Sequence, residues 1–449
     1  MFECLQSVTI GDMNRVLSRD VKAHVGKDIT LRGWLHKKRL LGGLNFILVR
    51  DRSGVAQVVV EDEAEVEKLR GLHIGTVLKV VGQVYEEPRA PSGAEVRQPK
   101  IAVEVPVTEE PPIEIDKPLS HKPENLDTLF DNRAIGLRNL QETAIFKIQS
   151  KVLEAVDEYL RQHEFTEMNT PKLLAGATEG GAEVFKLNYF GKEATLAQSA
   201  QFYKQMMVGV FERVFEINPT YRAEPSATTR HMTEYITIDA EMGFVTFSEL
   251  RNLAGGLLHH IVNKVWQDCE AELRMWNATK PLLADPIPSM TMKEIHELYS
   301  KEHGQDTTGE ADLRPDEERW ICGYAKKNLK NEAIFVTEWP ISSMKFYHKV
   351  NEDNPQVADR SDLLFRGVEI ATVPMREHRY EVLIKQLKEM AGGDPEHPGF
   401  KYYLQAFKYG LPPHGGWGWG LERTVEKLIG LDNVKEATLF PRDINRLTP

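Results

Sequence analysis

The chain has 449 residues, of which 41% are hydrophobic, and a formal net charge of −11 at neutral pH. This length allows two or three domains with ample cores, and no apolar run approaches a membrane span in length. The start, Met1-Phe2-Glu3-Cys4, lacks the pattern of a signal peptide, and three scattered cysteines argue against a disulfide framework or a zinc site, so we expect a reducing cytoplasm. The acidic charge repels nucleic acid, so any RNA contact would need a local basic patch.

Residues 1–105 form the first expected domain and read as a small all-β unit. Strand-like runs cover 29–36, 44–50, 55–60, 75–85 and 101–107. Five short strands of this kind fit an OB-fold barrel, which commonly binds single-stranded nucleic acid. The triplet Lys37-Lys38-Arg39 is a candidate basic patch, although an isolated basic triplet is more often a solvated turn.

A linker or hinge is expected over residues 106–130, which are rich in proline and charge. The second domain then covers 131–449 as a mixed, mainly antiparallel sheet flanked by helices, so the predicted fold class is α+β. It opens with an apolar stripe at helical spacing, followed by a strand and a proline over 165–171. The stripe consists of Ile145, Ile148, Val152, Val156 and Leu160.

The most informative segment is a predicted hairpin near the middle of the chain. Two strand-like runs, 214–217 and 235–242, flank a loop that carries Arg222, Arg230 and His231, which are groups that grip a polyphosphate. The second run alternates, so one face is core and the other is the wall of a site. The apolar face has Ile236, Ile238, Ala240 and Met242, and the other has Tyr235, Thr237, Asp239 and Glu241.

A glycine-rich run over 410–420 precedes a predicted helix near the C-terminus. Glycines let a backbone approach a ligand closely. Arg423 lies in the first turn of that helix, where a cation opposes the helix dipole. A role toward a ligand is therefore favoured over a structural one.

These segments together resemble the class II aminoacyl-tRNA synthetases. The stripe and strand resemble motif 1, which forms a homodimer interface; the hairpin resembles motif 2 and the glycine-rich run motif 3, both of which hold ATP. The resemblance implies catalysis by charge stabilisation at Arg222 and Arg423. It implies an ATP site of Arg222, Glu224, Arg230, His231, Tyr235, Glu369 and Arg423. Gly367-Val368-Glu369-Ile370 resembles the family's GxEI element, so Glu369, with Thr372, would bind Mg²⁺.

The segment Gln198 to Gln205 resembles the QSxQxxKQ element of the aspartyl-tRNA synthetases. The implied substrate is L-aspartate, because a buried carboxylate needs cations and arginine supplies bidentate geometry. An asparaginyl enzyme is opposed by Lys204, which an amide substrate would leave buried without a counter-charge. The implied aspartate site consists of Glu179, Ser199, Gln201, Lys204, Asp239, Arg376 and His414. Two segments beside it, Ala371–Pro374 and Ala358–Asp362, depart from the family's usual small and Ser/Thr-rich residues.

The barrel would read the anticodon of tRNA. Phe46 matches an aromatic residue that stacks on a base and Gln57 a base-contacting glutamine, although on sequence alone the barrel core is favoured for Phe46. His36 and Pro88 resemble the archaeal-type non-discriminating subtype, which charges both tRNA(Asp) and tRNA(Asn) with aspartate. That subtype implies functional coupling to an amidotransferase.

Three other functions stay open at this point. A strictly discriminating aspartyl enzyme would charge tRNA(Asp) alone. A synthetase-like asparagine synthetase binds no tRNA, and such paralogues lack the barrel. A pure RNA-binding module would not need Arg222, Glu369 and Arg423 together.

Overall fold

The computed structural model describes residues 15–40, 42, 45–119, 123–175, 183–226 and 228–449. The chain divides into two compact units, Met1–Thr143 and Ala144–Pro449. Within the described ranges, no helix is long and apolar enough to cross a membrane.

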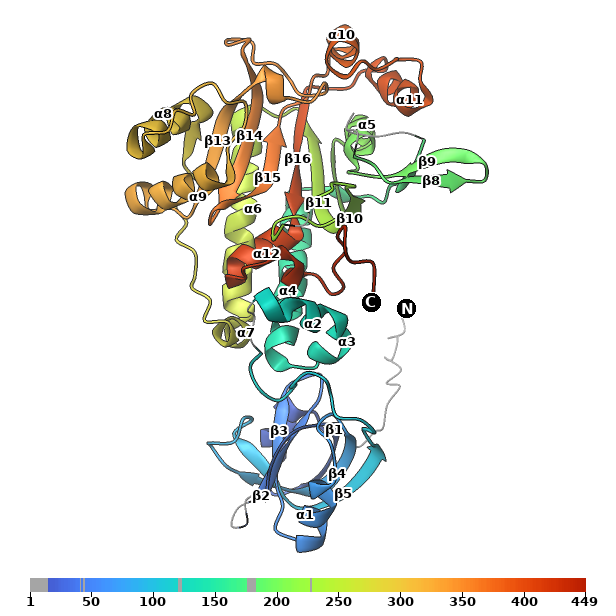
Figure 1. Cartoon of the computed structure of the whole chain (residues 1–449), viewed down its shortest axis with the longest axis vertical. Coiled ribbons are helices and arrows are strands. Elements are labelled where there is room, and N and C mark those ends of the chain that lie inside the picture. The colour runs from blue at the N-terminus through green and yellow to red at the C-terminus, as the bar shows by residue number, and fades with distance from the viewer. Residues whose placement is uncertain (1–14, 41, 43–44, 120–122, 176–182, 227) are drawn as a thin grey trace, which may run out of the picture. The chain divides into compact units, whose positions relative to one another are not determined.

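The first unit contains a closed five-stranded barrel, visible in blue in Figure 1. Its strand order is β1-β2-β3-β5-β4, and a helix, α1 (Glu63–Arg70), lies between β3 and β4 in the chain. Alternate residues such as Ile47, Val49 and Val80 fill its interior. The OB-fold expectation is therefore confirmed. The strands are β1 (Asp28–Leu40), β2 (Asn45–Arg50), β3 (Val55–Val59), β4 (Val77–Glu86) and β5 (Ala94–Val105).

The last strand of the barrel begins earlier than its sequence pattern indicates. β5 starts at Ala94 rather than at 101, and its pairing with β4 is interrupted by a register shift between Val81 and Gln83. This interruption explains why the sequence pattern misses the first half of the strand. Gln98 has a φ of 51° and Pro99 has no N–H to donate, so the alternation that marks a strand is broken there. The described part of the expected linker also contains all but the last residue of a helix, α2 (Pro123–Asp131), which α3 (Arg133–Gly136) follows.

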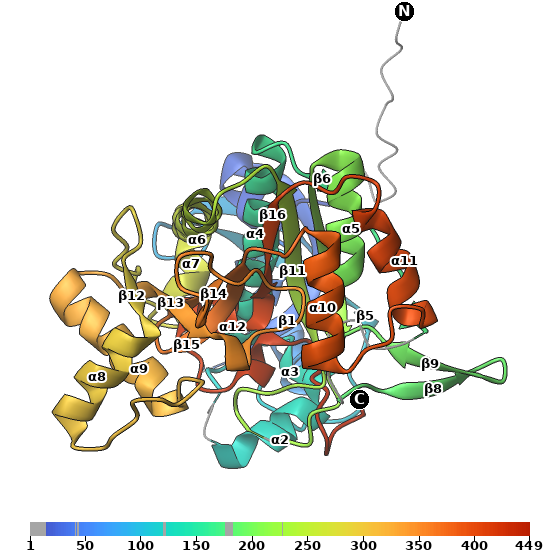
Figure 2. The same ribbon diagram turned by 90° about the horizontal axis from the view of Figure 1, so that it is seen from above.

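The second unit is built on an eight-stranded sheet, flanked by helices in Figures 1 and 2. Its order is β12-β13-β14-β15-β16-β11-β10-β6, and only the two edge pairs, β12/β13 and β6/β10, are parallel. This mixed, mainly antiparallel sheet confirms the predicted α+β class. Its strands are β6 (Thr166–Glu167), β10 (Arg213–Tyr221), β11 (Glu234–Gly243), β12 (Ser289–Thr291), β13 (Ala333–Pro340), β14 (Val357–Phe365), β15 (Val368–Pro374) and β16 (His414–Gly420). A smaller sheet holds β7 (Leu173–Leu174), β8 (Lys186–Tyr189) and β9 (Lys192–Leu196).

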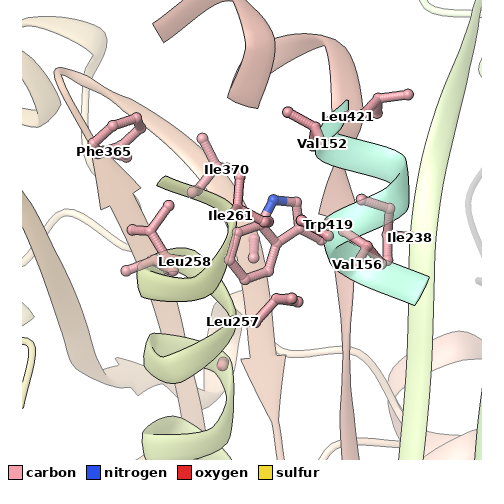
Figure 3. Packing of buried hydrophobic residues seen from close by; sticks show 14 of the residues in the cluster. Val152, Val156, Ile238, Leu257, Leu258, Ile261, Phe365, Ile370, Trp419 and Leu421 are labelled. Atoms are coloured by element: carbon pink, nitrogen blue, oxygen red, sulfur yellow. The ribbon is translucent and has the colours of Figure 1, made fainter. Parts of the chain in front are cut away.

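Long helices cover the apolar side of this sheet. The predicted stripe lies on α4 (Leu140–Gln162), and all five of its residues are fully buried in the main core. Such burial contributes roughly 1.5–3 kcal/mol per aliphatic side chain. α6 (Phe247–Asp268) starts at a capping box of Thr246 and Glu249 and packs its Leu257 and Ile261 near Trp419, as Figure 3 shows.

The remaining helices frame the other parts of the sheet. α8 and α9 share a cluster with β13, whereas α5, α10 and α11 share a second one around Phe202 and Tyr403. Their bounds are α5 (Gln201–Phe211), α7 (Glu270–Met275), α8 (Met292–His303), α9 (Pro315–Tyr324), α10 (Tyr380–Ala391), α11 (Pro398–Phe407) and α12 (Leu421–Ile429).

Candidate active site

A cavity of about 320 Å³ opens on the sheet face that the main core does not use. The alternation of β11 positions its wall: Tyr235, Thr237 and Asp239 line the cavity, while Ile238 and Ala240 enter the core. The strand prediction is thereby confirmed. Most of the implied ATP and aspartate residues line the same cavity, namely Ser199, Gln201, Lys204, Arg222, Glu224, Arg230, His231, Tyr235, Asp239, Glu369, Thr372, Arg376 and Arg423.

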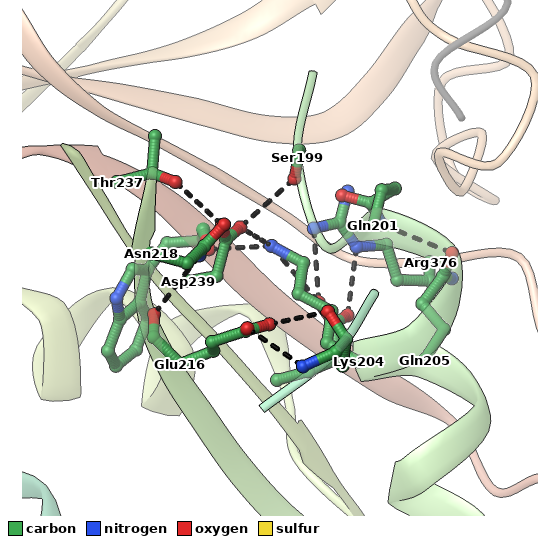
Figure 4. A network of polar contacts seen from close by, with 12 residues as sticks. Ser199, Gln201, Lys204, Gln205, Glu216, Asn218, Thr237, Asp239 and Arg376 are labelled. Carbon is green, nitrogen blue, oxygen red and sulfur yellow. Dashed lines mark hydrogen bonds and ion pairs between the residues drawn. The ribbon is translucent and has the colours of Figure 1, made fainter. Parts of the chain in front are cut away.

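One end of the cavity holds two buried ion pairs, drawn in Figure 4. Lys204 Nζ of α5 donates to Asp239 Oδ1 at 2.7 Å and to the Trp417 carbonyl at 2.7 Å. Arg376 forks onto Glu241, with its Nε 2.9 Å and its Nη2 3.2 Å from the two carboxylate oxygens. All four charged side chains are at most 2% exposed. Ser199, Asn218 and Thr237 also donate to Asp239. Despite burial, the pKa of this carboxyl is lowered, chiefly by Lys204 and further by Asn218 and Thr237.

This arrangement corrects the argument that an amide substrate would leave Lys204 without a counter-charge. Asp239 neutralises Lys204 and Glu241 neutralises Arg376 within the chain itself. The two pairs carry no net charge before any substrate binds. Exclusion of asparagine therefore cannot rest on an unpaired lysine. The sequence argument failed because a sequence pattern does not reveal which acids meet which bases in the fold.

His414 does not line the cavity; it belongs to a second layer behind it. Its Nδ1 lies 2.8 Å from the Pro412 carbonyl, which makes Nδ1 the protonated nitrogen, and its Nε2 accepts from Gln205 Nε2 at 3.0 Å. Gln205 Oε1 in turn accepts from Tyr403 and from Gln201. Burial lowers the pKa of His414 to about 4, so this layer is neutral. His414 thus reaches the cavity wall through Gln205 and Gln201.

The hairpin loop supplies two arginines and a histidine, all partly exposed, at the other end. The Arg222 guanidinium carbon lies 5.8 Å from the ring centre of Tyr235, and its Nη1 lies 3.6 Å from Glu224. His231 Nδ1 is 2.6 Å from the Thr228 hydroxyl, and burial lowers the pKa of this histidine. Arg230 is anchored instead, since its Nη1 donates to Glu318 at 2.7 Å.

A β-bulge brings the implied metal ligands onto the cavity face. The pairing of β14 with β15 shifts register at Leu363/Leu364, so Glu369 and Thr372 both face the cavity. Thr372 Oγ1 donates to Glu369 Oε1 at 2.7 Å, and Arg423 Nη1 donates to the Glu369 carbonyl at 2.9 Å. In the ranges that the structure describes, no group of three or more His, Cys, Asp or Glu could hold a metal alone.

Sequence reasoning missed part of the cavity wall. Glu241 does not line the cavity, but it accepts both hydrogen bonds from the wall residue Arg376, and the sequence indicates it only as a strand position. Arg360 of β14 lines the cavity and forks onto Asp362, whose pKa is raised to about 7 by burial and by the charge of Glu369. The departure of 358–362 from the family pattern was the available signal. Ser343, Lys345, Tyr347 and His348 also line the cavity, and no sequence pattern singled them out.

Glu179, which was predicted to contact aspartate, lies outside the described residues, as does the rest of 176–182.

On the barrel, the expectation that Phe46 belongs to the core is wrong. Ile47 and Val49 point inward, so Phe46 lies on the outer face of β2 with the Arg39 guanidinium 5.8 Å from its ring centre. Gln57 of β3 donates to Glu95 at 2.7 Å.

His36 is turned into the barrel wall rather than out of it. Strand alternation would place it beside the exposed Trp34, but a register shift between Leu35 and Lys37 makes it a bulge residue that is 7% exposed. Direct base contact by its ring is therefore not available in this conformation. Pro88 is exposed in the loop between β4 and β5.

The basic triplet lies in β1 and not in a solvated turn, and its three side chains have different surroundings. Lys38 donates to the carbonyls of Leu69, Arg70 and Leu72 at the end of α1, where a cation also suits the helix dipole. Lys37 and Arg39 remain exposed.

Comparison with known proteins identifies the family. Residues 125–444 match the model of class II tRNA synthetases (D, K and N), and residues 29–105 match the model of the OB-fold nucleic acid binding domain. An aspartate–tRNA(Asp/Asn) ligase of Thermus thermophilus is 43% identical over 440 residues, covering 97% of this chain and 100% of that protein. One of Methanopyrus kandleri is 41% identical over 430 residues, covering 94% of this chain and 96% of that protein.

The fold comparison leads to the same family. The crystal structure of asparaginyl-tRNA synthetase from Pyrococcus horikoshii, complexed with asparaginyl-adenylate, matches with a TM-score of 0.89 at 31% identity. The match covers 98% of this chain and 100% of that chain. The barrel, the mixed sheet and the two family models agree with the resemblance drawn from the three motifs. The chain belongs to the class II aminoacyl-tRNA synthetases, in the group that comprises the aspartyl, lysyl and asparaginyl enzymes.

Proposed function

We propose that this protein ligates L-aspartate to tRNA through an aspartyl-adenylate, and that it charges both tRNA(Asp) and tRNA(Asn). The observation that carries the proposal is the cavity, in which two buried cation–carboxylate pairs adjoin a cluster of partly exposed arginines and a histidine. The names of the full-length relatives favour aspartate and both tRNAs. The predicted discriminating and asparaginyl alternatives are not favoured by them.

The buried end of the cavity is the proposed aspartate site. Ser199, Gln201 and Asp239 would hold the α-amino group, with Asp239 as its negative partner. Lys204 and Arg376 would hold the side-chain carboxylate. Both cations already have acids, so the aspartate carboxylate joins a network of hydrogen bonds and does not fill a bare positive pocket. Glu179 and His414 complete the proposed set, the latter acting through Gln205.

The exposed end is the proposed ATP site. Arg222 would take the α-phosphate and His231 the γ-phosphate, while Tyr235 would pack against adenine; Glu224, Arg230 and Arg423 complete the set. The aspartate carboxylate attacks the α-phosphorus and pyrophosphate leaves, so no protein nucleophile is required. Fixed cations around the phosphates stabilise charge that spreads in the transition state.

Glu369 and Thr372 would hold Mg²⁺ together with phosphate oxygens of ATP. One carboxylate and one hydroxyl fit the preference of Mg²⁺ for oxygen ligands that it shares with a substrate. The ion would neutralise phosphate charge when bound.

The outer face of the barrel is the proposed anticodon-binding surface. Phe46, flanked by Arg39, offers an aromatic face for stacking, and Gln57 offers an amide whose orientation Glu95 sets. The exposed Pro88 lies in a neighbouring loop.

We infer the domain boundaries 1–105, 106–130 and 131–449, and a homodimer formed through α4 and β6. We also infer a cytoplasmic location and functional coupling to an amidotransferase that converts Asp-tRNA(Asn).

The deciding experiment charges purified tRNA(Asp) and tRNA(Asn) transcripts with radiolabelled aspartate and, in parallel, with radiolabelled asparagine. Comparable aspartate charging of both tRNAs supports the proposal. Charging of tRNA(Asp) alone would make the enzyme discriminating. Charging with asparagine would overturn the amino-acid assignment. Phe46→Ala provides an internal control, because it should impair charging of both tRNAs while leaving aspartate-dependent ATP–pyrophosphate exchange intact.

A further inference from the structure

The hairpin loop that carries the proposed phosphate-binding side chains is held by a segment distant from it in the chain. The Thr233 N–H donates to the Arg442 carbonyl at 2.9 Å, and the Val434 N–H donates to the Thr229 carbonyl at 3.0 Å. Arg442 also forms an antiparallel bridge with the first residue of β11. The loop thus has backbone anchors at two points, and both lie within residues 433–446, which we call the clasp.

One end of the clasp is fixed to the body of the second unit. It contains the short helix η4 (Val434–Ala437), which Asn433 caps by accepting from the Lys435 N–H at 3.1 Å. Gln149 of α4 donates to the Ala437 carbonyl at 2.7 Å, and Ala437 is fully buried in the main core. This end therefore cannot shift without disturbing the packing of the core.

The other end of the clasp depends on an ion pair between Lys435 and Asp443, whose side chains are 14% and 7% exposed. The Asp443 carboxylate also accepts from the Asn445 N–H at 2.7 Å. Despite burial, Lys435 lowers the pKa of this carboxyl, so the pair is charged at neutral pH. Asp443 directly follows Arg442 in the chain. The pair therefore ties the residue that anchors Thr233 back to η4.

Such support matters because the loop gathers like charges. Arg222, Arg230 and His231 line one cavity. Burial lowers the pKa of His231, and the nearby arginines lower it further although Glu224 opposes them. Repulsion of this kind favours a spread loop in the absence of a polyphosphate. The ion pair of the clasp does not line the cavity, so it can oppose the spreading without adding a charge beside the nucleotide.

We propose that Lys435 and Asp443 are positioning residues that hold the phosphate-binding loop in the geometry that receives ATP. They act through the two backbone hydrogen bonds of the clasp and touch neither the nucleotide nor the amino acid. This inference rests on the proposed ATP site. Because phosphate-binding groups must be placed accurately, a loosened clasp should weaken ATP binding. Aspartate binding, at the buried end of the cavity, should be spared.

The test measures KM for ATP and KM for aspartate separately, by ATP–pyrophosphate exchange with the full-length protein. Asp443→Asn should raise KM for ATP by about tenfold and change KM for aspartate by less than about twofold. Lys435→Met should reproduce this split, whereas Lys435→Arg keeps the ion pair and should retain KM for ATP to within about twofold. An unchanged KM for ATP in D443N and K435M would overturn the proposal, as would an equal rise in both KM values.

A matched control is available at Glu332. Its side chain is 9% exposed and lies 3.1 Å from Arg366, which is 16% exposed, and neither residue lines the cavity. Glu332→Gln therefore removes a comparably buried charge from the same unit, away from the loop. It should leave KM for ATP unchanged even where it lowers Tm. A rise in E332Q equal to that in D443N would show that KM for ATP follows general destabilisation, and the proposal would fail.

Hydrogen exchange followed by mass spectrometry tests the clasp without relying on activity. The peptides that contain the Thr233 and Val434 amides should exchange about tenfold faster in D443N than in wild type, with peptides from α6 unchanged. Wild-type rates in both peptides of D443N would refute the inference. In the unmodified protein the two amides should open at a common rate, because one clasp covers both; independent opening would refute it even if no variant folds. Failure of the proposed function is distinguished separately, by wild-type ATP–pyrophosphate exchange that does not depend on aspartate.

Discussion

Replacing Arg376 with methionine should separate the structural and the substrate-binding contributions of this arginine. The change removes a bidentate contact of 2.9 and 3.2 Å. Among the described residues, the fully buried Glu241 then keeps Lys204, at 3.8 Å, as its one ion-pair partner. Breaking a buried pair on one side costs about 3–5 kcal/mol, because the remaining charge stays desolvated. For the unit Ala144–Pro449, an unfolding entropy of about 2.1 cal/mol/K per residue converts this loss into a fall in Tm of roughly 5–8 °C.

The companion double variant, Arg376→Met with Glu241→Gln, removes both charges. Most of the lost stability should return, because no unpaired charge remains in the core. Aspartate binding should not return, because charge-assisted hydrogen bonds to the substrate carboxylate are still absent. Their loss, at about 3 kcal/mol, corresponds to an increase in KM for aspartate on the order of 100-fold.

Differential scanning fluorimetry gives the Tm of each variant, and aspartate-dependent ATP–pyrophosphate exchange gives KM and kcat. Arg274→Met is the control: its guanidinium and the carboxylate of its partner Glu270 are both 76% exposed, so a loss of no more than about 1 kcal/mol is expected. A double variant that regains both stability and the wild-type KM would show that Arg376 serves the fold alone. An unchanged Tm in the single variant would refute the buried-pair reasoning.

Three further predictions concern other parts of the molecule. Burial raises the pKa of Glu422 to about 7 from its usual 4.5. The contribution of its protonated form to the folding stability is therefore fully present below pH 4.5 and is lost as the pH rises through 7. Glu422→Gln keeps an acceptor for the Ile236 N–H. At pH 8 it should raise Tm and increase the free energy of unfolding by at most about 3 kcal/mol, whereas at pH 4 it should change neither. Equal gains at both pH values would contradict the assigned pKa. Phe46→Ala should raise KM for tRNA by an amount equivalent to about 1–3 kcal/mol of stacking, whereas Phe46→Tyr should retain binding; a fall in barrel stability with unchanged KM would instead indicate packing. Lys37→Ala with Arg39→Ala should weaken tRNA binding and flatten its salt dependence, while Lys38→Ala should chiefly lower the stability of the barrel, and the reverse pattern would contradict the observed side-chain directions.

The sequence by itself determined the elements whose pattern is local. The stripe from Ile145 to Leu160 predicts a core helix because residues three and four apart share a helix face, and α4 buries all five positions. The alternation from Tyr235 to Met242 predicts which side chains meet the cavity because a strand turns successive residues to opposite faces. The order of the three motifs was sufficient to indicate the family.

Only the tertiary structure decided which charges meet and where the local pattern fails. Arg376 and Glu241 are 135 residues apart in the chain, so no local periodicity reveals that Lys204 and Arg376 are already neutralised. His36 turns inward at a bulge that depends on pairing between strands, and Arg360 acquires its neighbours only when β13, β14 and β15 align. The physical reason is that periodicity records which face a residue takes within its own element, whereas electrostatic partners are chosen by the packing of elements that are distant in sequence.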